Sequence, residues 1–327
     1  MKIVNFDVEN YPREALEKLS RVGTLVYGPG SYWKEPSEDA WIELSRIVEN
    51  AEVLIVRMNH RIDRDLINAA PRLQIVASAT TGLNHIDEAA LRERNIKLIS
   101  LKGERDFLME IRSTPELTFG LMLALLRNIP AAFEDVKNGH WNNNAFQGRE
   151  LYGKTLGIVG FGRVGTIAAR IAKGFGMHVV AVDPYVDVLR FTEENVTQAT
   201  LPEVLEQSDI VSIHAAFTPE TKNMIGQAEF LRMKPGAYFI NTARGEIVAE
   251  VALLEALEKG QIAGAALDVL ANEHRFFGDV LKGHPFVGYA KTHPNLLIVP
   301  HIGGMARESV EKTSAFIADK VIAALKM

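Results

Sequence analysis

Short apolar runs alternate with amphipathic stretches along the first third of the chain. The runs predict strands, and the stretches between them predict helices with one apolar face. We expect strands at residues 3–8, 24–27, 53–56, 74–79 and 96–100, and helices at residues 12–20, 38–50, 63–69 and 87–94. This spacing is typical of βαβ units and a mostly parallel sheet. The run Val53–Val56 is apolar at every position, which predicts a strand covered on both faces.

The alternation resumes at residue 155 and continues to the end of the chain. Strands are expected at 155–159, 178–182, 210–214, 237–241, 262–269 and 296–299, and a last helix at 309–325. The charged stretch 104–112 lacks strand periodicity, so we interpret it as an interdomain segment. Thr114-Pro115-Glu116 begins a helix over 117–127, because proline and an acid both suit a first turn. The pattern predicts two doubly wound α/β units, with residues 112–301 inserted into a unit formed by 1–111 and 302–327.

The turn after the strand at 155–159 carries Gly160, Gly162 and Gly165 in a G-x-G-x-x-G pattern, and a helical pattern follows at once. This order is the context that a dinucleotide-binding turn requires, although glycine turns also occur without a ligand. The three glycines allow a tight turn, a close approach of backbone to a pyrophosphate, and close packing of helix on strand. The next strand ends at Asp183, where an acid binds ribose hydroxyls and repels a 2′-phosphate. The sequence therefore predicts NAD in preference to NADP.

Composition and charge narrow the function further. A chain of 327 residues is long enough for two domains. Its net charge of −5 does not indicate a protein that binds nucleic acid. The absence of cysteine excludes disulfides, thiolate catalysis and cysteine-ligated metal, and we predict no metal site. The N-terminus lacks the apolar core of a signal peptide, and no apolar run is long enough to span a bilayer. We expect a cytoplasmic protein that does not bind membranes.

Three side chains with suitable chemistry follow predicted strands in the second half of the chain. They are Arg244, Glu273 and His301. All three lie at carboxyl ends of strands, the edge where open α/β sheets bind ligands. Taken singly, each has an ordinary alternative: a surface arginine, a solvated glutamate and a loop histidine. Spacing alone does not decide between these interpretations.

Four segments together resemble the D-isomer-specific 2-hydroxyacid dehydrogenase family, which includes D-3-phosphoglycerate, glycerate and D-lactate dehydrogenases. Residues 153–165 resemble its cofactor signature, and residues 214–221 with 230–237 its second signature. Residues 241–245 with 265–269 resemble the third, and Pro300-His301-Ile302-Gly303-Gly304 resembles the segment with the catalytic histidine. The resemblance covers nearly the whole chain. It implies a Rossmann NAD-binding domain inserted into a flavodoxin-like substrate domain.

The resemblance also assigns roles to individual residues. His301 would be the general acid/base, Glu273 would bind its other imidazole nitrogen, and Arg244 would hold the substrate carboxylate. The implied substrate-binding residues are Arg57, Thr81, Gly82, Leu83, Arg244 and His301. Asp268 would lie beside the nicotinamide amide. The implied cofactor-binding residues are Gly160, Gly162, Arg163, Val164, Gly165, Asp183, Pro184, His214, Thr218, Thr242, Ala243, Arg244, Asp268, His301 and Gly303.

Two segments depart from the family pattern. His274 stands where the family commonly has proline, with a long loop at 276–293, and the connection 102–114 is also long and bears Lys102, Arg105 and Arg112. One hypothesis is that these segments shape a pocket for a larger or additionally anionic substrate. The alternative is a solvated charged loop. A surface ion pair is likewise the alternative to substrate binding for Arg57.

The sequence thus predicts an NAD-dependent enzyme that interconverts a D-2-hydroxy acid and its 2-keto acid. Family members are commonly homodimers through the cofactor domain, and the helix at 117–127 is the expected contact. Two other functions remain open: an NAD-sensing regulator on the same scaffold, and a dehydrogenase that oxidises phosphite or formate. Glu273 favours hydroxy-acid chemistry over formate, because the formate enzymes lack the glutamate at this position. The sequence does not identify the substrate.

Overall fold

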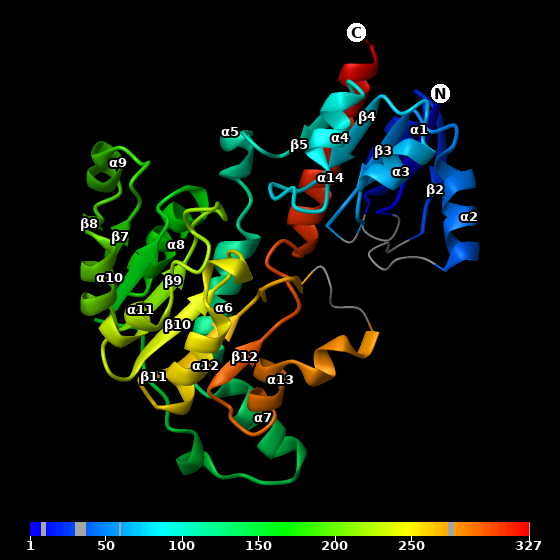
Figure 1. Ribbon diagram of the computed structural model, residues 1–327. Coiled ribbons are helices and arrows are strands. Elements are labelled where there is room, and N and C mark those ends of the chain that lie inside the picture. The colour runs from blue at the N-terminus through cyan, green and yellow to red at the C-terminus, as the bar shows by residue number, and fades with distance from the viewer. Residues whose placement is uncertain (8–10, 30–36, 59, 274–277, 327) are drawn as a thin grey trace. The chain divides into compact units, whose positions relative to one another are not determined.

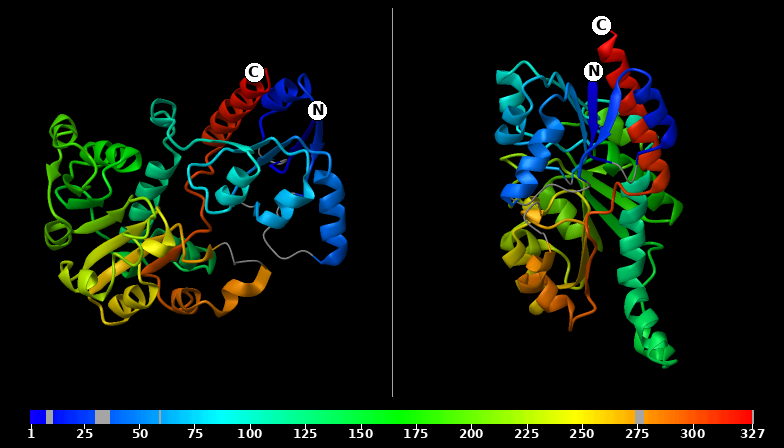
Figure 2. Two further views of the ribbon diagram at one scale, coloured as in Figure 1. Left: turned by 45° about the horizontal axis from the view of Figure 1, so that its top comes forward. Right: turned by 90° about the vertical axis from the view of Figure 1, so that its right-hand side faces the viewer.

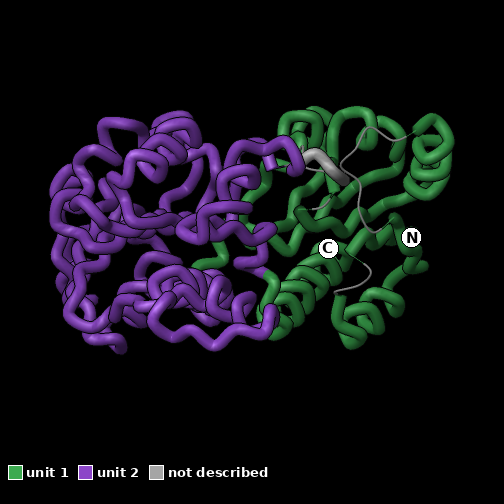
Figure 3. Tube along the Cα trace, turned by 90° about the horizontal axis from the view of Figure 1, so that it is seen from below, with its two compact units in different colours: residues 1–108, 305–327 green, residues 109–304 purple. Residues whose placement is uncertain are grey.

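The chain divides into two compact units in the computed structural model, which describes residues 1–7, 11–29, 37–58, 60–273 and 278–326. Unit 1 consists of residues 1–108 and 305–327, and unit 2 of residues 109–304 (Figure 3). The sequence predicted the two boundaries between the units near residues 111 and 302. The assignment of substrate to the first unit stays a prediction.

Unit 1 is built on a parallel sheet of five strands (Figure 1). Its order is β2-β1-β3-β4-β5, and every neighbouring pair is parallel. The strands are β1 (Lys2–Asn5), β2 (Thr24–Tyr27), β3 (Val53–Val56), β4 (Ile75–Ser78) and β5 (Lys97–Ser100). Because all five strands are parallel, the loops that follow them gather at one edge of the sheet, and the strand order reverses between β1 and β3.

Helices cover both faces of this sheet. One core lies under α2, α3 and α4, where Leu44, Leu66 and Leu91 join side chains of β1, β3 and β4. The terminal helix α14 packs against α1 and against β4 and β5 (Figure 2). The helices are α1 (Arg13–Ser20), α2 (Glu38–Val48), α3 (Arg64–Ala69), α4 (Glu88–Glu93), α5 (Arg105–Leu108) and α14 (Arg307–Leu325).

Unit 2 contains a parallel sheet of seven strands in the order β12-β11-β10-β9-β6-β7-β8. The order reverses between β6 and β9, which creates the crevice where doubly wound sheets bind dinucleotides. The strands are β6 (Thr155–Val159), β7 (His178–Val182), β8 (Thr197–Gln198), β9 (Ile210–Ile213), β10 (Ala237–Asn241), β11 (Ile262–Leu267) and β12 (Leu296–Ile298).

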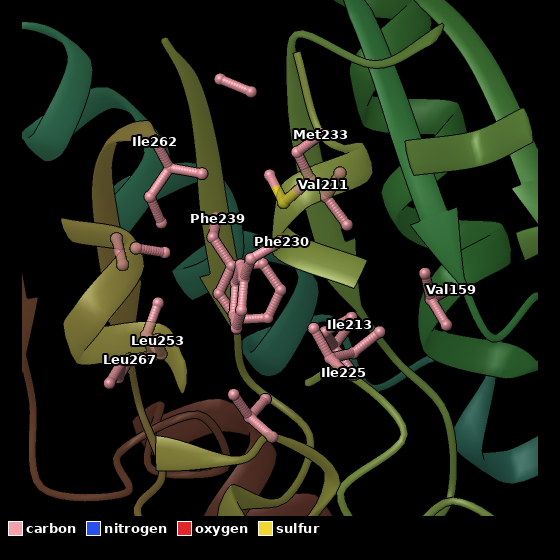
Figure 4. Packing of buried hydrophobic residues seen from close by; sticks show 14 of the residues in the cluster. Val159, Val211, Ile213, Ile225, Phe230, Met233, Phe239, Leu253, Ile262 and Leu267 are labelled. Carbon is pink, nitrogen blue, oxygen red and sulfur yellow. The ribbon is translucent and has the colours of Figure 1, made fainter. Parts of the chain in front are cut away.

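Two hydrophobic cores hold helices to the faces of this sheet. In one, Met122 of α6 and Ala168 of α8 meet Ile158 of β6. In the other, Phe230 and Leu253 meet Phe239 of β10 (Figure 4). The helices are α6 (Ser113–Leu126), α7 (Ile129–Lys137), α8 (Arg163–Gly174), α9 (Val188–Glu193), α10 (Leu201–Gln207), α11 (Gln227–Arg232), α12 (Glu250–Glu258) and α13 (Pro285–Ala290), with short 3₁₀ turns η1 (Asn143–Phe146), η2 (Gly245–Ile247) and η4 (Gly278–Gly283).

The expected long loop at 276–293 is wrong from residue 278 onward. Helix α13 lies within it, with His284 Nδ1 accepting the backbone N–H of Phe286 and Pro285 in the first turn. Phe286 is buried in the core, which anchors the helix. His274 and Phe276 lie outside the described residues.

The stretch 104–112, interpreted from the sequence as an interdomain segment, contains α5 and the boundary between the units after residue 108. The ring of Phe107 stacks on Phe316 of α14 at a centroid distance of 3.9 Å, and Glu104 pairs with Lys320. Lys102, Arg105 and Arg112 are exposed. A pocket-shaping role for these three cations therefore stays a hypothesis.

No single helix of the described residues combines the length and the apolar character of a membrane span. Among the described residues, one pair of segments, 105–126 and 129–137, has that length and apolar character when the two are taken together, but the chain bends by 62° between them. This match rests on length and composition alone.

Close packing of β6 on α10 makes Gly157 a test of the fold. A Cβ at this position would lie 2.1 Å from Ser208 Oγ and 2.8 Å from Val204 Cγ1. We predict that Gly157→Ala destabilises the protein by about 1–3 kcal/mol, the usual cost of overpacking a core. The shift in the midpoint of urea unfolding measures this effect. Gly174→Ala is the matched control, because Gly174 ends α8 with no atom within 4 Å of the added carbon. Equal midpoints for the two variants would contradict the prediction.

Candidate functional site

The turn between β6 and α8 requires two of its glycines for steric reasons. Gly160 has a φ of 96°, and a Cβ there would lie 2.4 Å from the backbone nitrogen of Ala215. A Cβ on Gly165 would lie 2.1 Å from the carbonyl oxygen of Gly160. At Gly162, the N-cap of α8, an added Cβ would meet no atom within 4 Å. The N-terminus of α8 therefore opens onto free space, as a pyrophosphate site needs.

Asp183 lies one residue beyond β7, beside this turn. Its Oδ2 accepts the N–H of Phe161 at 2.9 Å, and its Oδ1 accepts the N–H of Tyr185 at 3.0 Å. These bonds fix the carboxylate next to the glycine turn while each oxygen keeps a lone pair for a ribose hydroxyl. The neighbouring Pro184 is exposed. The position fits the role that the sequence predicts for Asp183.

The other predicted cofactor residues of this half lie in the first turn of α8 and in the loop that follows β9. Arg163 begins α8, and its guanidinium donates to the carbonyl of Ile111 at 3.1 Å, so its side chain is engaged within unit 2. His214 follows β9, where Ser212 Oγ lies 2.9 Å from its Nε2. Burial lowers the pKa of His214 to about 4, so the ring is neutral near pH 7. Val164 is the second residue of α8, and Thr218 lies in the exposed loop after β9.

The loop after β10 is tied together by Asn241, which is buried. Asn241 Oδ1 accepts the N–H of Ala243 at 3.0 Å, and its Nδ2 donates to the carbonyl of Arg244 at 2.9 Å. Thr242 Oγ1 lies 2.9 Å from Thr118 Oγ1 of α6. A Cβ on Gly245 would lie 2.0 Å from the backbone of Leu270, so the loop also packs tightly on the end of β11. These contacts fix the backbone at Arg244.

His301 and Glu273 are brought together directly. His301 Nδ1 lies 2.5 Å from Glu273 Oε1, and both side chains are partly buried. Glu273 follows β11, and His301 follows β12, so the contact joins two loops at the carboxyl edge of the sheet. His301 has a φ of 51°, which is uncommon for a residue other than glycine. The histidine is therefore held in a defined and somewhat strained geometry.

Asp268 fixes the backbone that carries His301. Its carboxylate accepts the N–H of Ile302 at 2.6 Å and of Gly303 at 2.9 Å, while its carbonyl accepts the N–H of His301 at 2.8 Å. Burial raises the pKa of Asp268 to about 6, against the favourable charge of His301 and these two N–H groups. A Cβ on Gly303 would lie 2.7 Å from Asp268 Oδ2. Asp268 thus supports the loop that carries His301. The sequence resemblance implied only a contact with the nicotinamide for Asp268 and did not predict this supporting role.

The predicted substrate residues of unit 1 follow β3 and β4. Arg57 Nε lies 3.4 Å from Asp7 Oδ2, and both side chains are nearly buried. Among the described residues, Arg57 Nη1 has no hydrogen-bond partner, so this cation retains donor capacity. Leu83 is buried by its side chain, whereas Thr81 beside it is exposed. Their role in substrate binding stays a prediction.

Sequence reasoning missed the residues that brace these loops. Asn241 carried a signal, because asparagine directly before a loop commonly bonds the backbone two residues ahead. The contact of Thr118 with Thr242 joins residues far apart in sequence and had no local signal.

Comparison with known proteins agrees with this geometry. Residues 119–303, more than half of the chain, match the family model described as the D-isomer specific 2-hydroxyacid dehydrogenase NAD binding domain. The chain is 34% identical over 309 residues to a D-3-phosphoglycerate dehydrogenase of Methanocaldococcus jannaschii, which covers 94% of this chain and 55% of that protein. It is also 34% identical over 301 residues to a glyoxylate reductase of Thermococcus litoralis, covering 90% and 86% of the two chains.

A solved structure shows the same likeness in three dimensions. D-lactate dehydrogenase from Aquifex aeolicus, complexed with NAD and lactic acid, superimposes with a TM-score of 0.81 at 26% identity, covering 100% of this chain and 96% of that one. The chain spans about half the length of the D-3-phosphoglycerate dehydrogenases that it matches. The glycine turn, the acid after β7 and the matched domain make NAD the cofactor of unit 2. The chain belongs to the D-isomer specific 2-hydroxyacid dehydrogenase family.

Proposed function

We propose that this chain is an NAD-dependent oxidoreductase that interconverts a D-2-hydroxy acid and its 2-keto acid, with His301 as general acid/base. The observation that carries the proposal is the 2.5 Å contact of His301 Nδ1 with Glu273 Oε1. A carboxylate at Nδ1 holds a proton on that nitrogen and orients the ring, which leaves Nε2 to exchange a proton with a substrate.

The proposed chemistry divides between cofactor and protein. The glycine turn after β6 and Asp183 would hold NAD, which would supply hydride transfer at the carbon that bears the hydroxyl or keto oxygen. In reduction, His301 Nε2 donates the proton that the keto oxygen gains. In oxidation, the same nitrogen removes the hydroxyl proton, and Glu273 stabilises the imidazolium that forms.

Arg244 is proposed to hold the substrate carboxylate. One edge of its guanidinium is already fixed, because Nη1 donates to the carbonyl of Ala243 at 2.6 Å. The remaining N–H groups form a planar fork that matches a carboxylate. Arg57 and the backbone of Thr81, Gly82 and Leu83 are proposed as further substrate contacts.

The substrate class is proposed from the chemistry of these groups and from the relatives. A cation, backbone N–H donors and a proton-exchanging histidine suit a 2-keto acid, and the relatives carry names of enzymes that act on such acids. The side chain on the acid stays open.

We further propose a homodimer formed through unit 2. The helix expected to make the contact, α6, packs Phe119, Met122 and Leu125 into its own core. Helix α7 instead exposes Ile129 and Phe133, with 52% and 63% of their surface accessible, and its Val136 lies on the same face by spacing. Trp141, just beyond the helix, is 88% exposed. Apolar groups exposed together in this way are typical of protein contacts.

The primary test is NADH oxidation with a panel of 2-keto acids. The panel contains glyoxylate, pyruvate, hydroxypyruvate, phosphohydroxypyruvate and bulky aliphatic or aromatic keto acids. We expect turnover with at least one of them and a loss of about 10²–10⁴-fold in kcat for His301→Gln, the usual contribution of a general acid. NADH affinity, measured by fluorescence, should be unchanged. Tight NADH binding without turnover on any acid would contradict the proposal and favour a sensor.

Arg244→Lys tests the proposed contact with the carboxylate. Lysine keeps the charge but cannot form two parallel hydrogen bonds. We expect KM for the best keto acid to rise about 10–100-fold, which corresponds to losing one charge-assisted hydrogen bond. An unchanged KM with a lower kcat would show that Arg244 does not bind the ground-state carboxylate.

Phe133→Asp combined with Ile129→Asp tests the proposed dimer contact. Two buried charges at an interface without partners oppose association. We expect the double variant to sediment as a monomer and the wild type as a dimer. Val251→Asp is the control, because Val251 is an exposed apolar residue of another helix, α12. A monomeric wild type, or a dimeric double variant, would overturn the proposed interface.

A further inference from the structure

Three buried or partly buried side chains, at the end of β4 and in the loop that follows it, form a series of hydrogen bonds that the proposed function does not use. His85 Nε2 lies 3.2 Å from Ser78 Oγ, Ser78 Oγ lies 2.8 Å from Thr80 Oγ1, and Thr80 Oγ1 donates to the carbonyl oxygen of Gly82 at 2.9 Å. Ser78 is fully buried and His85 is 5% exposed. The last of these hydrogen bonds is made to Gly82, in the loop proposed to bind the substrate.

Each hydroxyl has one proton to donate, and this fixes which atom is the donor in each of these hydrogen bonds. The only proton of the Thr80 hydroxyl goes to the Gly82 carbonyl, so Thr80 Oγ1 accepts from Ser78. The only proton of Ser78 is then used, so Ser78 Oγ accepts from His85 Nε2. The opposite arrangement would set two acceptors against each other at 2.8 Å. His85 therefore carries a proton on Nε2.

The last bond sets the orientation of the peptide between Gly82 and Leu83. No cis peptide bond is found in the described chain, so this peptide is trans. In a trans peptide the C=O and the following N–H point in opposite directions. Because Thr80 holds the Gly82 carbonyl, the N–H of Leu83 points away from the chain of hydroxyls.

The rest of Leu83 is committed to unit 1. Its side chain packs in the core under α2, α3 and α4, and its carbonyl accepts the N–H of Ile86 at 2.9 Å. Its N–H has no hydrogen-bond partner among the residues that the structure describes. A backbone N–H that is held in place and has no protein partner is free to donate to an anion, as backbone N–H groups do in anion-binding concavities.

We propose that His85, Ser78 and Thr80 are positioning residues that aim the Leu83 N–H at the carboxylate of the substrate. This inference rests on the proposed function, because that function supplies the carboxylate. None of the three side chains touches the substrate. They act through the Gly82–Leu83 peptide.

Thr80→Val is the sharpest test, because it keeps the β-branched shape and removes the donor to Gly82. We expect the KM for the keto acid to rise about tenfold, the equivalent of one hydrogen bond, with kcat within about twofold and NADH affinity unchanged. Ser78→Ala and His85→Phe act further along the chain, so their effects on KM should be progressively smaller. His85→Gln, which can still donate to Ser78, should retain most of the wild-type KM.

Thr313→Val is the matched control. Thr313 is a buried threonine of α14 in the same unit, and its hydroxyl donates to the carbonyl of Ser309 at 2.7 Å. It should show the same loss of thermal stability as Thr80→Val without the change in KM. If the three side chains only stabilise the fold, His85→Phe, the largest change in shape, should instead have the largest effect on KM.

Two readouts separate this inference from the proposed function. Turnover of any 2-keto acid tests the function. The calorimetric affinity of the NADH complex for oxamate, a keto-acid mimic that accepts no hydride, tests the carboxylate contact. Weaker oxamate binding by Thr80→Val supports the inference even without turnover. A wild-type complex that does not bind oxamate, or a Thr80→Val complex with unchanged affinity, overturns it, whatever the turnover shows.

Discussion

The common direction of the strands is the constraint on which the site in unit 2 depends. All seven strands are parallel, so every loop that follows a strand lies at the same edge of the sheet. Gly160 and His301, which are 141 positions apart in the sequence, therefore lie at the same edge of the sheet. The glycine turn follows β6, Asp183 follows β7, Arg244 follows β10, and His301 follows β12. A single antiparallel strand among β6, β10 and β12 would carry its loop to the opposite edge.

Asp268 shows how this edge is made rigid. A buried carboxylate is costly, and the raised pKa of about 6 reflects that cost. The cost is offset by the two N–H groups of Ile302 and Gly303, which would otherwise be unpaired. The same bonds hold His301 at a positive φ, which an unsupported loop would leave. One side chain thus stabilises the loop and sets the position of the residue proposed to exchange the proton.

The sequence predicted the parts of the fold that depend on periodicity. The run Val53–Val56 is apolar throughout and forms β3 with those bounds, and the glycine spacing located the turn after β6. Helix α13 was missed because its start depends on the ring of His284 capping the backbone and on the burial of Phe286. Neither effect has a period. The hydrogen bonds that link His85, Ser78, Thr80 and Gly82 were missed for a related reason: a serine that ends a strand and a threonine and a histidine in the loop after it are ordinary until the fold brings the two hydroxyls and the imidazole together.

The proposed catalytic groups are each supported within one unit. In unit 2, His301 is oriented by Glu273 and Asp268, and Arg244 by the loop that Asn241 ties together. In unit 1, the Gly82–Leu83 peptide is oriented by Thr80 and by the burial of Leu83. Binding therefore does not have to create the geometry of either set, because each is fixed by contacts in its own core. Groups that are already oriented lose little freedom on binding, so more of the interaction energy remains for the substrate.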